Sequence, residues 1–226
     1  MLFTIKNDTY TKKITADTIH NRYEMIRMPF DNLRVGLRDY EDDYMYMIID
    51  FSALLLSEKG KIVDDDYFVF YGSECRLSSD KRSVLKLNSG GHESDLFSCD
   101  PEASVVGSCG NYLGDYENDN GVNEEEEYLD WFDVDLKKIN NDVKEILFVV
   151  SAYQGQYPHR TDFINRVFID VLADDRLFCE FCFVFSFENC SAIESISLIR
   201  LENEWWIKSV GHGFPGGLVE VLDKYC

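Results

Sequence analysis

The fold is decided by the stretch Met45-Tyr46-Met47-Ile48-Ile49-Asp50-Phe51-Ser52-Ala53-Leu54-Leu55-Leu56, in which Asp50 is the one charged residue. A turn sequence, Glu58-Lys59-Gly60-Lys61, follows it and leads to a second apolar run, Tyr67-Phe68-Val69-Phe70-Tyr71. Runs of apolar, β-branched and aromatic residues that are bounded by turn residues are typical of strands. The sequence therefore predicts a hairpin whose first strand is buried.

Further runs of this kind predict more strands, and they are Ile146–Tyr153, Arg166–Leu172, Leu177–Phe187, Ser195–Leu201 and Asn203–Val210. The first of them carries no charge, which indicates a central strand buried on both faces. Alternation from Phe3 to Lys13 predicts an edge strand.

Two short segments have apolar residues at helical intervals: Asp135–Ile146 and, after a glycine-rich turn, Gly217–Lys224. With many strands and only short helices, sheet-on-sheet packing is the expected architecture. We therefore predict a mainly β fold, a β-sandwich of two sheets with short peripheral helices and a short C-terminal helix. A chain of 226 residues fits a single domain of this kind over residues 1–226.

Acidic residues are concentrated between Leu87 and Leu136, a segment with no Lys or Arg that holds 14 of the 42 Asp and Glu residues. Around its centre, from Gly114 to Glu127, oxygen-bearing side chains recur at close spacing, and Ca²⁺ prefers such oxygen ligands. An EF-hand is disfavoured, because Asn120 takes the place of the turn glycine and no flanking helices are indicated. A solvated loop is the alternative for such a charge block.

The overall charge limits the partners of the chain. A formal net charge of −20 and a pI near 4.4 disfavour binding to nucleic acid and to anionic membranes, because both are bound through clusters of Lys and Arg. No apolar stretch is long enough for a signal peptide or a membrane helix. Seven cysteines, an odd number, favour a reducing compartment, and we expect a cytoplasmic protein without membrane insertion.

A CxxC motif, Cys179-Glu180-Phe181-Cys182, lies within the predicted strand Leu177–Phe187. A redox CxxC needs a helix N-terminus that lowers a thiol pKa, and a zinc site needs two further ligands near by. The sequence indicates neither, so we predict buried strand cysteines.

Five segments in order carry a family resemblance, and they are Leu33–Leu37, Asp50–Leu56, Gly60–Tyr71, Asp135–Val150 and Glu204–Leu218. They resemble, respectively, the RVGLGWD, DLDASAFLL, GKVxSDDDFVFYNN, DL-helix-IVFVV and EWKFRAVGQGYAGGL motifs of the tellurium-resistance TerD family of bacterial stress proteins. The resemblance covers nearly the whole chain. It implies a single β-sandwich that binds Ca²⁺ through acidic loops clustered at one end, with a role in tolerance of tellurite and other stresses.

The chain departs from the family pattern in the metal loop and in one strand. Residues 112–130 correspond to the acidic metal loop, but Asn118-Asp119-Asn120-Gly121 replaces the Thr-Gly-x-Gly centre. Ile48 stands where the family has the first Asp of DLDAS, so the two ions that the family implies reduce here to one ion or to weaker binding. A segment at about residues 74–111 exceeds the usual connection and is expected to be a chain-specific insertion.

Carboxylates crowded without counter-charge are costly, and a divalent cation would remove their repulsion. The residues predicted to approach Ca²⁺ are Asp50, Asp64, Asp65, Asp66, Asp115, Asp119, Glu125 and Glu126. The alternative is that Asp64–Asp66 only end a hairpin turn and the other acids stay solvated.

His212, in the turn Gly211–Gly217, has no nucleophile at a known catalytic spacing, so we expect no enzymatic activity. The sequence thus predicts a non-enzymatic Ca²⁺-binding stress-response protein that acts through ion-ordered acidic loops and contact with a protein partner. The alternative is a small-molecule-binding or scaffold module of the same fold whose metal sites are degenerate.

Overall fold

The computed structural model describes residues 2–7, 10–14, 25–39, 48–87, 96–108, 128–153, 164–186 and 190–226. Its elements are β1 (Leu2–Asn7), β2 (Tyr10–Ile14), β3 (Ile26–Arg27), β4 (Asn32–Asp39), β5 (Ile48–Ser57), the 3-10 turn η2 (Asp65–Tyr67), β6 (Phe68–Val69), β7 (Cys75–Leu77), β8 (Val84–Lys86), β9 (Phe97–Ser98), β10 (Val105–Gly107), β11 (Asp130–Asp135), β12 (Val143–Tyr153), β13 (Ile164–Ala173), β14 (Arg176–Ser186), β15 (Ala192–Leu201), β16 (Glu204–Phe214) and α1 (Gly217–Tyr225).

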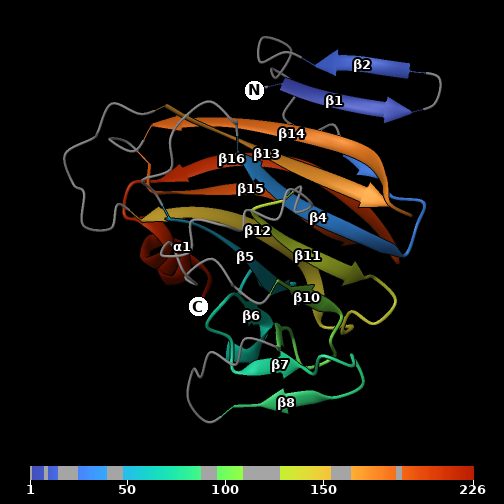
Figure 1. The fold of residues 1–226 in the computed structure, drawn as a ribbon, viewed down its shortest axis with the longest axis vertical. Coiled ribbons are helices and arrows are strands. Elements are labelled where there is room, and N and C mark those ends of the chain that lie inside the picture. The colour runs from blue at the N-terminus through green and yellow to red at the C-terminus, as the bar shows by residue number, and fades with distance from the viewer. Residues whose placement is uncertain are drawn as a thin grey trace, which may run out of the picture.

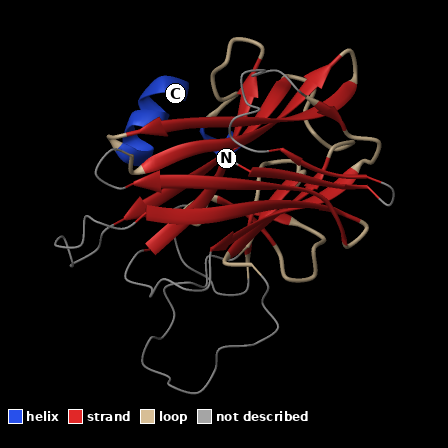
Figure 2. Ribbon diagram, turned by 90° about the horizontal axis from the view of Figure 1, so that it is seen from above, coloured by secondary structure: helices blue, strands red, loops and turns tan. Residues whose placement is uncertain are grey.

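Two antiparallel sheets pack face to face, which confirms the mainly β sandwich (Figures 1 and 2). Sheet A has the strand order β10-β11-β4-β13-β14-β1-β2, and sheet B has the order β3-β16-β15-β12-β5-β6. A third, small sheet, β8-β7-β9, lies beside them and was not predicted. Its strands fall within residues 74–111, the segment that the sequence marks as a chain-specific insertion.

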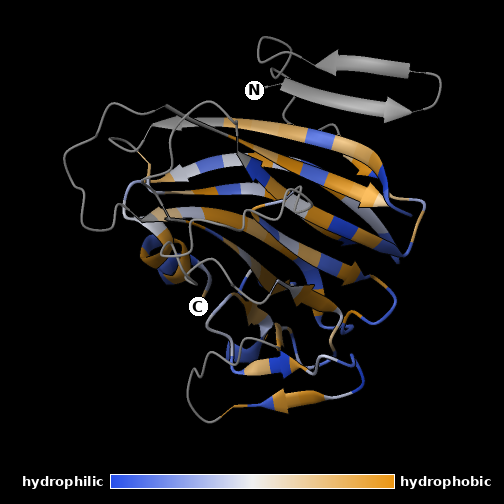
Figure 3. Ribbon diagram, viewed as in Figure 1, coloured by the Kyte–Doolittle hydropathy of each residue, from blue (hydrophilic) through white to orange (hydrophobic). Residues whose placement is uncertain are grey.

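The core between the sheets is centred on three phenylalanines. Phe51 of β5 and Phe148 of β12 come from sheet B, and Phe132 of β11 comes from sheet A. The Phe51 ring centroid lies 5.2 Å from that of Phe132 and 5.7 Å from that of Phe148. All three side chains are at most 2% exposed. Figure 3 shows apolar residues along the strands of both sheets.

β12 is buried on both faces, as the uncharged run from Ile146 predicted. Ile146, Phe148 and Val150 join the core between the sheets, whereas Leu147 and Val149 belong to a second apolar cluster on the other face of sheet B. Val221 of α1 belongs to that second cluster. The helix therefore covers the outer face of sheet B, and the predicted C-terminal helix is confirmed (Figure 1).

Two sequence predictions about individual elements are wrong. The segment from Phe3 to Lys13 contains two strands, β1 and β2, paired as a hairpin, and only β2 lies at the edge of sheet A. The predicted helix over Asp135–Ile146 is absent: turns follow β11, and β12 begins at Val143. The Asp135 side chain accepts the Lys137 N–H at 3.1 Å, and the Asn140 side chain accepts the Asp142 N–H at 3.0 Å. Such local bonds compete with helix formation.

The CxxC cysteines are buried in β14, as predicted, with Cys179 1% and Cys182 4% exposed. On the outer face of sheet A, the Tyr128 ring lies over Gly36, where a Cβ atom would be 2.3 Å from a ring carbon. No helix in the described part of the chain is long and apolar enough to cross a membrane.

Candidate metal centre

Asp130 begins β11, and its carboxylate is bonded to the chain on both sides of the acidic residues 109–127. It accepts hydrogen bonds from the Ser108 hydroxyl, which lies just after β10, and from the Trp131 N–H at 2.8 Å. The backbone N–H of Phe51 in β5 also acts to lower the pKa of this carboxyl. β6 pairs with β5 only at Ala53 and Leu54, so Phe51 lies beyond that pairing. The Asp130 carboxylate thus holds β10 and β11 of sheet A together at a place where β11 contacts β5 of sheet B.

Asp50, one residue before Phe51, is close enough for its negative charge to act on this carboxylate, although strand alternation places its side chain on the face of β5 that carries Leu54 and Leu56. Burial raises the pKa of the Asp130 carboxyl to about 6, and the negative charge of Asp50 adds to the increase. Burial also raises the pKa of Asp50. No ion pair to either carboxylate is found among the described residues. Each of the two carboxyls is therefore in an environment that disfavours its negative charge.

The most acidic part of the chain, residues 109–127, begins and ends next to Asp130; these residues are called the acidic segment below. The chain enters residues 109–127 directly after Ser108 and leaves them at Tyr128, two residues before Asp130. The hydrogen bond between Ser108 and Asp130 holds the two ends together. Four predicted ligands, Asp115, Asp119, Glu125 and Glu126, fall within these residues, outside the part of the chain that the structure describes.

The three aspartates Asp64, Asp65 and Asp66 lie apart from Asp50. Ala53 is opposite Val69 in the β5–β6 pairing, and because the strands are antiparallel, Asp50 and Asp66 extend from that pair in opposite directions. The two aspartates are therefore separated by roughly 15 to 20 Å along the strands. The structure does not bring them together.

Each of these three aspartates has a local environment of its own. Asp64 caps η2 by accepting the Asp66 N–H at 3.1 Å, and Asp66 forms an ion pair with Lys86 at 2.6 Å. Asp65 is exposed. Asp64 thus takes part in a turn, which is the alternative that the sequence offered for Asp64–Asp66.

A second pair of acids, Asp100 and Glu102, lies at the base of the small sheet. Asp100 is fully buried and accepts the N–H groups of Ser104 and Val105, both at 2.7 Å, and the Ser104 hydroxyl at 2.6 Å. Burial raises the pKa of Asp100 to about 6. Its side chain is within hydrogen-bond reach of Glu102.

Glu102 has one satisfied and one unsatisfied oxygen. Its Oε1 accepts hydrogen bonds from the Tyr67 hydroxyl at 2.7 Å and from Asn140 Nδ2 at 2.9 Å, whereas its buried Oε2 has no partner. Burial acts to raise the pKa of Glu102, but the bonds from Asn140 and Tyr67 outweigh it and lower that pKa. No group of three or more His, Cys, Asp or Glu side chains arranged to hold a metal occurs among the described residues.

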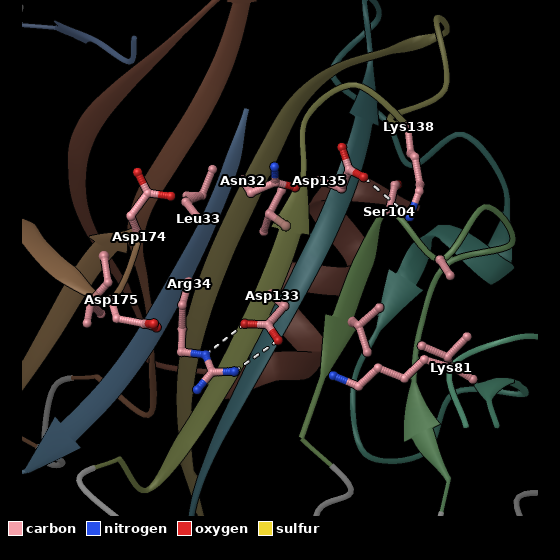
Figure 4. Close-up of a pocket in the computed structure, with 15 residues that line it drawn as sticks. Asn32, Leu33, Arg34, Lys81, Ser104, Asp133, Asp135, Lys138, Asp174 and Asp175 are labelled. Carbon is pink, nitrogen blue, oxygen red and sulfur yellow. Dashed lines mark hydrogen bonds and ion pairs between the residues drawn. The ribbon is translucent and has the colours of Figure 1, made fainter. Parts of the chain in front are cut away.

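A groove with a volume of about 470 Å³ lies on the outer face of sheet A and includes none of the predicted ligands (Figure 4). The Arg34 guanidinium binds both oxygens of Asp133, at 2.7 and 2.9 Å, across its middle. Asp174 and Asp175 line one end, and Lys81 lines the other (Figure 4). The groove therefore presents charges of both signs.

The fold and the site together define an acidic antiparallel β-sandwich with two carboxylates at the base of an acidic segment. The TerD domain family model matches residues 111–225, about half of the chain, so the chain belongs to the TerD domain family. The matched part includes Asp130 and the acidic segment from Asp115 to Glu126, but not Asp50.

A curated relative is the "Tellurium resistance protein TerD" of Serratia marcescens, which is 26% identical over 182 residues that cover 78% of this chain and 77% of the relative. Two solved structures are similar in part. The protein SAV2460, of unknown function, has a TM-score of 0.46 and 11% identity, covering 87% of this chain and 98% of its own. A homologue of telluride resistance protein (TerD), SCO6318 from Streptomyces coelicolor A3(2), has a TM-score of 0.45 and 12% identity, covering 85% and 95%.

Sequence reasoning missed Asp130 and Ser108. The signal for Asp130 was present: it is the first residue of the alternating run Asp130-Trp131-Phe132-Asp133-Val134-Asp135, in which Phe132 and Val134 face the core. Strand alternation therefore directs Asp130 inward, where a carboxylate requires partners.

Proposed function

We propose that this TerD-family chain is a non-enzymatic Ca²⁺-binding protein of the tellurium-resistance type. The observation that carries the proposal is the electrostatic interaction of Asp50 with Asp130, two carboxylates without an ion-pair partner among the described residues, near the place where the acidic segment begins and ends. Carboxylates with raised pKa values repel each other, and a bound cation would remove that repulsion. A site whose ligands are all oxygen atoms suits Ca²⁺.

In this proposal Asp50 and Asp130 hold the cation from the sandwich, and Asp115, Asp119, Glu125 and Glu126 supply the remaining ligands. The bound ion would supply positive charge that favours the ionised form of all these acids. Ser108 and the Trp131 N–H orient Asp130 by their hydrogen bonds. Because the Ile48 side chain has no ligating atom and Lys86 engages Asp66, one ion fits this chain better than two.

The first test is thermal unfolding of chelator-treated protein with and without millimolar Ca²⁺, with Mg²⁺ as the control ion. A ligand that binds only the folded state at 100 times its Kd stabilises it by about 2.7 kcal/mol. For a chain of this size each kcal/mol shifts Tm by about 2 to 4 °C. We expect a Ca²⁺-dependent rise of that order in the wild type.

Variants locate the site. Asp130→Asn and Asp50→Asn should each lose most of the Ca²⁺-dependent rise, because each removes one charged ligand. The exposed Asp142→Asn is the matched control and should keep it. An undiminished rise in both site variants, or no rise in the wild type, contradicts the proposal.

The stress role rests on the family and on the printed name of the Serratia marcescens relative. We propose that the ion-ordered acidic segment forms a surface that a protein partner contacts. Expression of the wild type should raise the tellurite tolerance of a sensitive bacterium, and expression of Asp130→Asn should not. Equal tellurite tolerance with the wild type and with Asp130→Asn would show that the stress role does not depend on the metal.

The alternative is a small-molecule-binding or scaffold module with a degenerate metal site. Ile48, at a position where the family pattern has Asp, favours it, and the groove in Figure 4 offers a binding surface. This alternative predicts no Ca²⁺-dependent change in Tm and undiminished tolerance with Asp130→Asn.

A further inference from the structure

Cys75 and Cys99 lie directly opposite each other in the small sheet. The β7–β9 pairing aligns Arg76 with Ser98 and Leu77 with Phe97, and one step further along the register Cys75 meets Cys99. The Cys99 N–H donates to the Cys75 carbonyl at 3.2 Å. Hydrogen-bonded antiparallel pairs have Cα atoms about 5.5 Å apart, which lies within the range of about 4.4 to 6.8 Å that disulfides span. Their Cβ atoms are about 5 to 5.5 Å apart, so closing the bond draws the two strands together by about 1 Å.

Both side chains lie on the same face of the small sheet. Cys75, Leu77, Cys99 and Val106 form one buried apolar cluster, and Arg76, between the first two, donates from its guanidinium to the Tyr71 carbonyl. The two thiols therefore share an apolar environment and do not point to opposite faces.

The CxxC motif lacks this geometry. Cys179 and Cys182 are three residues apart in β14, and side chains at odd separations along a strand point to opposite faces. Cys179 belongs to the core between the sheets, and Cys182 does not. The pair that sequence spacing brings to notice is thus not the pair that the fold places together.

We propose that Cys75 and Cys99 form a reversible disulfide when the chain meets a small-molecule disulfide such as oxidised glutathione. The Cys75 thiolate attacks one sulfur of that disulfide and releases one small thiol. The Cys99 thiolate then attacks the Cys75 sulfur of the mixed disulfide and releases the second small thiol. In total, the two protein thiols lose two protons and two electrons, which reduce the small disulfide to two thiols.

The bond would fasten the small sheet to the sandwich, because Cys99 also pairs with Val106 of β10, an edge strand of sheet A. This inference is independent of the proposed metal site. Tyr67, Glu102 and Asn140 already connect the same region to the chain before β12. Oxidation would add a covalent link to this noncovalent junction.

Burial sets the rate of the reaction. Cys75 is 4% exposed and Cys99 is fully buried. Burial, followed by the negative charge of Asp66, raises the pKa of Cys75 to about 11. Burial, followed by Asp100 and Cys75, raises the pKa of Cys99 to about 12. Thiolates are the attacking species, so exchange in the folded protein should be slow at neutral pH and faster at pH 9 or when the small sheet opens.

The experiment uses Cys226→Ser protein, because Cys226 is the exposed cysteine of the described chain and would react first. The protein is incubated with oxidised glutathione at pH 9, and separately refolded from urea in the same buffer. Alkylation and peptide mass mapping should then show one cross-link between the Cys75 and Cys99 peptides, with the mass of two hydrogens lost. The oxidised protein should melt several degrees higher, because the link closes a loop.

Two controls make the result specific. Cys75→Ser should abolish both the cross-link and the rise in Tm, and Cys75→Ala should do the same if serine proves too polar for the apolar cluster. Cys190→Ser should preserve both. The proposal is overturned if Cys75 and Cys99 are both recovered alkylated after the two treatments, or if either is linked to another cysteine.

Discussion

Replacing Asp100 with Asn should stabilise the protein at neutral pH, although it removes a buried charge that accepts three hydrogen bonds. Asn keeps the Oδ1 that accepts the N–H groups of Ser104 and Val105. Its Nδ2 takes the place of Oδ2, from where it can donate to the unsatisfied Oε2 of Glu102, while the Ser104 hydroxyl changes from donor to acceptor. The variant thus imitates the protonated aspartic acid.

The magnitude follows from the pKa of Asp100, which burial raises from 3.8 to about 6. One pKa unit corresponds to about 1.4 kcal/mol, so the charged form costs about 3 kcal/mol at neutral pH. The lowered pKa of Glu102 offsets part of this cost, since the two acids interact. We therefore expect Asp100→Asn to raise the free energy of unfolding by about 2 kcal/mol at pH 7.5.

The pH dependence gives the sign of the effect. Because the folded-state pKa of Asp100 is above the unfolded value, the folded state binds more protons between about pH 4 and pH 6. This contribution to stability is fully present below that window and is lost as the pH rises through it. Asp100→Asn should remove that loss.

Urea unfolding at pH 4.5 and pH 7.5 measures both quantities, with the exposed Asp142→Asn as the matched control. The gain from Asp100→Asn should be larger at pH 7.5 than at pH 4.5. A variant that is less stable than the wild type at pH 7.5, or equally changed at both pH values, would refute the reasoning about the carboxyl pair.

Two further substitutions test the packing outside the core. Gly36→Ala should destabilise the chain by about 1 to 3 kcal/mol in urea unfolding, because the new methyl group would meet the Tyr128 ring, and a Tyr128→Ala background should remove most of that cost. Glu194→Gln should lower the free energy of unfolding by about 1 to 3 kcal/mol. The reason is that the buried Glu194 carboxylate accepts hydrogen bonds from Lys224 at 2.7 Å and from the Tyr225 hydroxyl at 2.6 Å. An unchanged urea midpoint would show that these two bonds do not hold α1 to sheet B.

Strands made almost entirely of apolar residues could be predicted from the sequence. β5, β12 and β14 are long apolar runs with at most one acid in their interiors, so burial leaves them few alternatives. The segment from Asp135 to Asn140 could not be predicted in this way, because its apolar spacing fits a helix whereas its Asp and Asn side chains bond to local backbone groups. Periodicity does not report that competition.

Part of the candidate metal site could be proposed from the sequence alone. Composition identified the acidic segment, and the family motif identified Asp50. The position of Asp130 depends on a contact between β11 and β5, which are about 80 residues apart in the chain and belong to different sheets. Neighbouring acids in the sequence, such as Asp64 and Asp66, are separated from Asp50 by strand direction. Contacts between residues so far apart in the chain cannot be inferred from the local spacing of residue types.

The hydrogen bond between Ser108 and Asp130 has a consequence for how the sequence between them can vary. With both ends held by the sandwich, the entropy of closing that loop depends only on the logarithm of its length, and doubling the length costs about 0.6 kcal/mol. Residues can therefore be inserted, removed or exchanged there while the two sheets keep almost all of their stability. Side-chain chemistry in the segment can therefore change without a new fold.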